Sequence, residues 1–202
     1  MNSKFDFVLL EPSEVYSWLL NLDVRRSIRT LQVHHTWKPD YKNFTGNNHY
    51  VIARAMQDYH MKNRGFSDIA QNFTTFPDGS IMRCRKLEII PAGIVGANAG
   101  SLCIENLGNF DIDGDIMTDA HKDSIVNLFA SLCKRFNITP SLNTIVYHHW
   151  YDLATGKRTM GTGQTKSCPG TNFFGGNTAE DARDTFIPLI VKRMEQLINV
   201  NS

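Results

Sequence analysis

Short apolar segments with the residue types of β-strands alternate along this chain with longer segments of helical periodicity. The strand-like segments are TLQVHHTW (30–37), IAQNFTTF (69–76), IMRCRKLEII (81–90), GSLCIENLG (100–108) and TIVYHHWYD (144–152). A chain with this alternation must bury both faces of a sheet under helices. The pattern therefore predicts an α/β fold, with a central mixed β-sheet flanked by helices.

Helix and turn signals refine this prediction. Residues 12–30 are predicted to form one short helix, with Ser13 as its N-cap, followed by a turn and a basic connector. Further helices are predicted over 48–65, from Thr118 to residue 136, and over 178–200, where Phe186, Leu189, Ile190, Met194 and Leu197 share one face. The sequence Pro77-Asp78-Gly79 predicts a hairpin turn between two strands. We expect one domain over 1–202, with a helical extension at 1–29, a core at 30–175 and a C-terminal helix at 178–200.

Charge and hydropathy exclude several functional classes. The 21 basic and 20 acidic side chains give a net charge of +1, which does not favour binding to nucleic acid. No apolar run approaches the roughly 18 residues that would span a bilayer. The first 20 residues lack a basic start and a small-residue cleavage site, so we expect synthesis in the cytoplasm without a signal peptide. In that compartment Cys84, Cys103 and Cys133 are interpreted as small core residues rather than disulfide partners.

Two histidine pairs stand near the ends of apolar strands, at 34–35 and 148–149. Neighbouring residues of a strand point to opposite faces, so at most one histidine of each pair can belong to a given site. A lone strand histidine is more often an ordinary hydrogen-bonded residue. Two such strand ends, together with Cys168 in a loop rich in glycine and proline, favour a metal site instead. Two imidazoles and one thiolate suit zinc and leave a fourth position open.

Two further residues could support such a site. Lys166 and Cys168 project to the same side of an extended segment, and a nearby lysine lowers the pKa of a thiol. Glu105 lies inside an apolar strand, where a carboxylate is costly unless it is paired or acts beside a cation. It is a candidate general base, and a structural ion pair is the alternative. For Cys168 the alternative is an inert buried thiol.

Two other motifs do not fit their usual functions. The stretch DIDGD (111–115) resembles the start of a calcium loop, but Ile116 and Lys122 occupy the positions that need Gly and Glu, so we interpret it as a polar turn. A thiol-protease nucleophile at Cys168 would need a helix start nearby, which Pro169-Gly170 disfavours.

In combination, these segments resemble the type 2, zinc-dependent N-acetylmuramoyl-L-alanine amidases, a superfamily that includes phage lysozyme-amidases and animal peptidoglycan recognition proteins. The resemblance covers residues 30–175 and rests on the order of five motifs: LQVHHTW, GFSDIAQNFTTFPDGSIMRCR, GSLCIENLGNFD, IVYHHWYD and TKSCPGTNFF. It implies the fold of that superfamily and Zn²⁺ as cofactor. The endolysins of phages and prophages are the most similar form.

The resemblance also implies a role for each matching position. The zinc ligands of the family correspond to His34, His148 and Cys168, a lysine that stabilises the oxyanion corresponds to Lys166, and the general base corresponds to Glu105. The implied reaction is hydrolysis of the amide between the lactyl group of N-acetylmuramic acid and L-alanine in peptidoglycan. The enzyme would then act on the cell wall after holin-type or lytic release. A non-catalytic peptidoglycan-binding receptor and a cytoplasmic muropeptide-recycling amidase remain alternatives, and a His-rich nuclease is disfavoured by the charge.

The sequence departs from the family at two places. Some members use a tyrosine in the strand before the Asp-Gly turn, where this chain has Gln71, and this favours Glu105 as base. The stretch between His148 and Cys168 is about ten residues longer than usual, and we expect this insert (151–163) to form a mobile flap over the cleft. Trp37 and Trp150, beside two of the implied ligands, are candidates to line the groove or to pack in the core.

Overall fold

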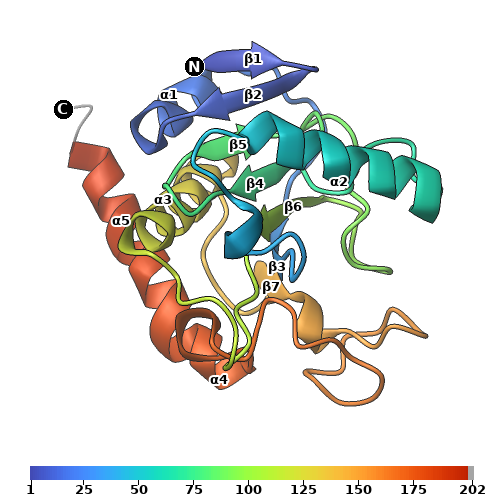
Figure 1. The fold of residues 1–202 in the computed structure, drawn as a ribbon. Helices are drawn as coiled ribbons and strands as arrows, with labels where there is room; N and C mark the ends of the chain where they lie inside the picture. The colour runs from blue at the N-terminus through green and yellow to red at the C-terminus, as the bar shows by residue number, and fades with distance from the viewer. Residues whose placement is uncertain (200–202) are drawn as a thin grey trace.

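A computed structural model describes residues 1–199 of the chain. Seven strands form a single sheet in the order β1-β2-β5-β4-β6-β3-β7 (Figure 1). The strands are β1 (Asn2–Lys4), β2 (Phe7–Leu10), β3 (Thr30–His35), β4 (Phe73–Thr75), β5 (Ile81–Arg83), β6 (Ser101–Asn106) and β7 (Ile145–Tyr147). Pairing is antiparallel from β1 to β4 and parallel from β4 to β7. The expected mixed α/β sheet is confirmed.

Helices cover both faces of this sheet (Figure 1). On one side lies α2 (His49–Arg64), whose Ile52, Ala53 and Met56 pack on Met82 and Cys84. On the other side lie α1 (Val15–Leu20), α3 (Asp119–Phe136) and the C-terminal helical segment, which comprises α4 (Ala179–Asp181), a π-helical stretch (Ala182–Phe186) and α5 (Ile187–Asn199). Each strand residue of the parallel part therefore faces either the α2 side or the α3 side.

Several local predictions agree with the structure. Thr118 caps α3 by accepting a hydrogen bond from the His121 backbone N–H, and α2 ends at Gly65, which has a φ of 67°. Thr178 and Asp181 form the capping box that opens the C-terminal helical segment. That segment runs to Asn199, and residue 200 of the predicted helix lies outside the described residues.

Other local predictions are wrong. The helical extension predicted for residues 1–29 contains its short helix, at Val15–Leu20, but it begins with the β1–β2 hairpin, which was not predicted. The helix there starts from a 3₁₀ turn capped by Glu11 rather than by Ser13, because Glu11 and Glu14 form a capping box around Pro12. In the C-terminal helical segment, Leu189 is 41% exposed and does not share the buried face with Phe186.

Candidate metal centre

Three side chains from distant parts of the chain meet beside the carboxyl end of β3. His34 is the penultimate residue of β3, His148 begins a 3₁₀ turn directly after β7, and Cys168 lies in the loop that follows the insert. Their nearest ligand atoms all lie within 4.8 Å of one another, and each residue is at most 9% exposed. His148 was predicted at the end of a strand. The strand instead ends at Tyr147, and the following turn directs His148 toward His34.

The spacing of the donor atoms can be compared with a zinc site. His34 Nδ1 lies 3.2 Å from His148 Nδ1 and 3.6 Å from Cys168 Sγ. Tetrahedral zinc with bonds of about 2.0–2.1 Å to nitrogen and about 2.3 Å to sulfur separates two nitrogens by about 3.3 Å, and nitrogen from sulfur by about 3.6 Å. Two imidazoles and a thiolate are also ligands that zinc accepts. The donor types and the two distances from His34 Nδ1 therefore fit this ion, and the donor atoms of His148 and Cys168 lie within 4.8 Å of each other.

The loop that carries Cys168 is held from two sides. The backbone N–H of His149 donates to the carbonyl of Cys168 at 2.7 Å, which fixes the loop against the turn that carries His148. Asp111 accepts hydrogen bonds from Ser167 Oγ and from the Thr171 backbone N–H, both at 3.1 Å. The DIDGD turn thus holds the loop that carries Cys168 in place through hydrogen bonds to Asp111. This role was missed because the motif gives no sign of its distant partner.

Glu105 reaches the same site through strand register. The parallel pairing of β3 and β6 places Glu105 directly opposite His34, with both side chains on the α2 face of the sheet. Burial raises the pKa of Glu105, and the positive charge of Lys166 offsets part of this rise; the resulting pKa is about 7. Lys166 itself is exposed. The structure therefore brings a carboxyl group and a lysine close to the His34, His148 and Cys168 cluster.

Burial controls the protonation of the three candidate ligands. It lowers the pKa of His148 to about 4 and that of His34 well below its usual value, so both imidazoles are neutral at pH 7. Burial also raises the pKa of the Cys168 thiol, whereas the His35 backbone N–H and Lys166 lower it. The predicted effect of Lys166 on this thiol thus has the right direction, but burial outweighs it.

The second member of each histidine pair lies outside the cluster. His35 Nδ1 accepts a hydrogen bond from the Phe110 backbone N–H at 3.1 Å. The ring of His149 donates from Nδ1 to the Lys166 carbonyl at 2.6 Å, which holds the backbone of the lysine. Of these four histidines, only His34 and His148 turn their rings toward Cys168. Strand alternation explains this for the pair in β3, whereas His148 and His149 are separated by the 3₁₀ turn after β7.

The two candidate tryptophans have different environments. Trp150 is fully buried, stacks on Tyr147 and donates from Nε1 to the Asn177 carbonyl at 2.8 Å, so it is a core residue. Trp37 is 56% exposed on the segment that follows β3. Gln71, at the position where some relatives have tyrosine, is fully buried and donates from Nε2 to Thr74 Oγ1 at 3.0 Å.

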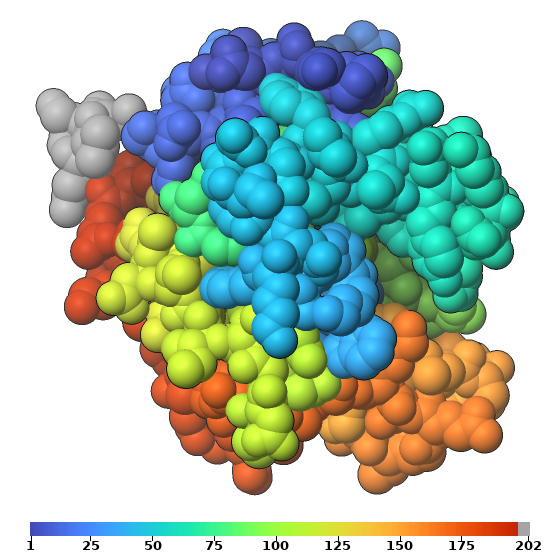
Figure 2. All heavy atoms as spheres, viewed as in Figure 1, coloured from blue at the N-terminus to red at the C-terminus, as the bar shows by residue number. Residues whose placement is uncertain are grey.

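The insert 151–163 is a wound loop that projects from the body of the molecule (Figure 2). Asp152 organises it by accepting hydrogen bonds from the backbone N–H groups of Thr155, at 2.8 Å, and Gln164, at 2.9 Å. At its tip, Gly156 lies against Gly96, where an added Cβ on Gly96 would be 2.5 Å from the Gly156 carbonyl oxygen. The expected flap is therefore hydrogen-bonded at its base and in contact with a second loop at its tip.

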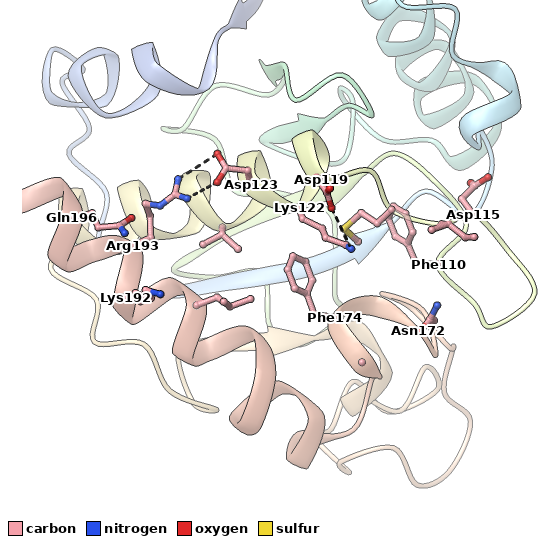
Figure 3. A pocket seen from close by; sticks show the side chains of 15 residues that line it. Phe110, Asp115, Asp119, Lys122, Asp123, Asn172, Phe174, Lys192, Arg193 and Gln196 are labelled. Carbon is pink, nitrogen blue, oxygen red and sulfur yellow. Dashed lines mark hydrogen bonds and ion pairs between the residues drawn. The ribbon is translucent and has the colours of Figure 1, made fainter.

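A cavity away from this centre lies between α3 and α5 (Figure 3). It has a volume of about 630 Å³ and is crossed by the ion pairs Lys122–Asp119 and Arg193–Asp123. Phe110, Met117 and Phe174 contribute apolar surface. The cavity contains none of the clustered His and Cys residues, so its size does not mark it as the site of chemistry.

Comparison with known proteins covers the part of the chain that contains His34, His148 and Cys168. The family model for N-acetylmuramoyl-L-alanine amidase matches residues 24–171, nearly three quarters of the chain. The chain belongs to this amidase family. This match confirms the resemblance to type 2 amidases that the five motifs indicated. It also spans the whole interval from His34 to Cys168.

Individual relatives agree with this assignment. Peptidoglycan-recognition protein SC2 of Drosophila melanogaster is 29% identical over 119 residues, which are 59% of this chain and 56% of that protein. The chain thus aligns with little more than half the length of this relative. The amidase LysC from Clostridium intestinale has a TM-score of 0.56 and 25% identity, over 79% of this chain and 85% of its own. Drosophila PGRP-LB, with a TM-score of 0.59 and 22% identity over 80% and 83%, shares the fold.

None of the described helices is long and apolar enough to cross a membrane.

Proposed function

We propose that this chain is a zinc-dependent N-acetylmuramoyl-L-alanine amidase that cleaves the amide between the lactyl group of N-acetylmuramic acid and L-alanine of peptidoglycan. The observation that carries the proposal is the convergence of His34, His148 and Cys168, in which the distances from His34 Nδ1 to His148 Nδ1 and to Cys168 Sγ match those of tetrahedral zinc. Membership of the amidase family supports the assignment of this amide as the bond that is cleaved.

The proposed ligands are His34, His148 and Cys168, and three protein ligands leave one position for water or substrate. Zinc, when bound, supplies a Lewis acid that polarises the scissile carbonyl and lowers the pKa of water. Glu105, with a pKa of about 7, is suited to accept a proton from the attacking water near neutral pH and to pass it to the leaving amine. The exposed cation of Lys166 would stabilise negative charge on the carbonyl oxygen.

The biological setting is proposed from the relatives. LysC of Clostridium intestinale is an amidase, and a related structure from the same organism, LysCS, is described as an endolysin. We therefore infer that the substrate is peptidoglycan of the cell wall, which the enzyme reaches after lytic release. A receptor that binds without hydrolysis is the second candidate, because the curated relatives are peptidoglycan-recognition proteins.

Digestion of purified cell walls, with and without a chelator, tests the proposal. We expect new L-alanine amino termini without new reducing sugar ends, and we expect a chelator to abolish their release until zinc is restored. New reducing ends, or chelator-resistant release, would contradict the assignment. Binding to walls without any release would favour the receptor, and release from soluble muropeptides alone would favour a recycling amidase.

A further inference from the structure

Gln32 lies two residues before His34 on β3, so both side chains point to the α2 face of the sheet. It is fully buried. Three acceptors surround its Nε2, which has two hydrogens to share among them: the carbonyl of Ala97 at 3.0 Å, Asn98 Oδ1 at 3.2 Å and Ser101 Oγ at 2.9 Å. Its Oε1 lies 3.3 Å from His34 Nε2. Gln32 thus connects the loop over 93–98 to one proposed zinc ligand.

Two backbone groups fix the orientation of the Gln32 amide. The N–H of Ile94, which can only donate, lies 3.1 Å from Oε1, and the carbonyl of Ala97, which can only accept, faces Nε2. The amide cannot be reversed without opposing donor to donor and acceptor to acceptor. Oε1 therefore faces His34 Nε2, and this ring nitrogen must carry the proton. The lone pair of the neutral ring is then on Nδ1, the atom that faces His148 and Cys168.

We propose that Gln32 is a positioning residue that holds His34 in the Nε2–H tautomer and so presents Nδ1 to the metal. The inference rests on the proposed zinc site. Outer hydrogen bonds of this kind orient a ligating imidazole and increase its basicity. The same geometry assigns the Nδ1 proton to His148 in the metal-free protein, because His34 Nδ1 can only accept across their 3.2 Å contact.

Gly93 explains how the loop can approach so closely. A Cβ at this position would lie 2.1 Å from Gln32 Oε1 and 3.1 Å from His34 Nε2. Any side chain at position 93 would therefore displace the acceptor from the histidine. The Gly93→Ala variant thus perturbs the same contact without changing Gln32 itself.

The test is nitrogen-15 NMR of the histidine rings in the metal-free protein, paired with zinc affinity measured by competition with a chromophoric chelator. In the wild type we expect His34 to be entirely the Nε2–H tautomer. In Gln32→Leu we expect a mixture of tautomers and zinc binding that is about 10–100-fold weaker. Gly93→Ala should also give a mixture of tautomers and weaker zinc binding. It provides the test if Gln32→Leu does not fold.

Two further variants separate this role from a merely structural one. Gln32→Glu keeps an acceptor toward His34 but loses the donors to the loop, so it should keep the tautomer and bind zinc more tightly than Gln32→Leu. Ser101→Ala removes one acceptor of Nε2 and should leave both readouts unchanged. An unchanged tautomer in Gln32→Leu and Gly93→Ala, or equal zinc loss in the Leu and Glu variants, would overturn the inference. None of these outcomes depends on wall digestion. A failure of the proposed amidase function would therefore be distinguished from a failure of this inference.

Discussion

At the scale of single residues, burial removes charge from the candidate centre. The pKa of His34 and His148 is lowered, that of the Cys168 thiol is raised, and that of Glu105 rises to about 7. Each shift has desolvation as its largest cause. A bound divalent cation reverses this balance, because it stabilises a thiolate directly. The site is thus organised so that ligand charge and metal binding depend on each other.

Cys168→Ser tests the sulfur ligand. The variant should lose zinc on dialysis and should lose amidase activity together with it, because a serine hydroxyl is not deprotonated to a comparable ligand near pH 7. Metal analysis and release of L-alanine amino termini measure the two effects. Cys133→Ala is the matched control, because this buried cysteine lies in α3 and contacts the core. A Cys168→Ser protein that retains zinc after dialysis would remove the cysteine from the ligand set.

Glu105→Gln tests the proposed base. The amide cannot accept a proton, so activity should fall by about 10²–10⁴-fold, while zinc content stays at the wild-type level. Steady-state release of amino termini and metal analysis on the same preparation measure this. Full activity in the variant would exclude Glu105 as the base.

The raised pKa of Glu105 predicts that the stability of the metal-free protein depends on pH, and the Glu105→Gln variant tests this. The pKa of Glu105 rises from 4.5 to about 7 on folding, so the folded state favours the protonated carboxyl. Its contribution is fully present below pH 4.5 and is lost as pH rises toward 7, a difference of about 3 kcal/mol. Urea unfolding of wild type and Glu105→Gln should therefore diverge over this interval, with the wild type losing stability relative to the variant. Parallel pH profiles would contradict the raised pKa.

At the scale of elements, the long periodic segments were predictable and the short ones were not. The helix from Thr118 and the strand that carries Glu105 have strong patterns and clear ends. The β1–β2 hairpin has neither, because β1 is wholly exposed and its turn uses Phe5 and Asp6 at positive φ, where Asn-Gly is the usual signal.

The candidate site, too, was predictable only where a local sequence pattern specifies it. The alternation of side chains along strands limited each histidine pair to one ligand, but it could not select which. That choice came from family resemblance at the sequence level, and in the structure it depends on packing at the ends of β3 and β7. The contact between Gln32 and His34 depends on a loop whose path no local pattern specifies.

The insert 151–163 gives a prediction at this scale. In Gly96→Ala, the new Cβ would lie 2.5 Å from the Gly156 carbonyl, so the tip of the insert must move away from the loop beneath it. We expect trypsin to cleave several-fold faster at Lys157 and Arg158. Gly46→Ala is the control, since it has a similar positive φ but no atom within 4 Å of the new Cβ. Equal cleavage rates in the two variants would show that this contact does not restrain the insert.

At the scale of the whole molecule, β2 joins the two sides of the sheet. Phe7 is buried in the core on the α2 side, and Leu10 is buried in the core on the α3 side, each 1% exposed. β2 also pairs with β5, so the N-terminal hairpin continues the sheet rather than resting on it. We therefore propose that residues 1–199 unfold as one cooperative unit, and that the N-terminal segment is part of this unit.

Leu10→Ala tests that proposal. If the hairpin is integral, loss of this buried side chain should lower the free energy of unfolding of the whole protein by about 2–5 kcal/mol, because it leaves a cavity beneath the sheet. Leu20→Ala, at a leucine that is 53% exposed, should change it by no more than about 0.5 kcal/mol. Urea unfolding followed by both tryptophan fluorescence and circular dichroism measures the effect. A hairpin that is only an appendage would instead give a separate early transition in Leu10→Ala and leave the main midpoint at its wild-type value.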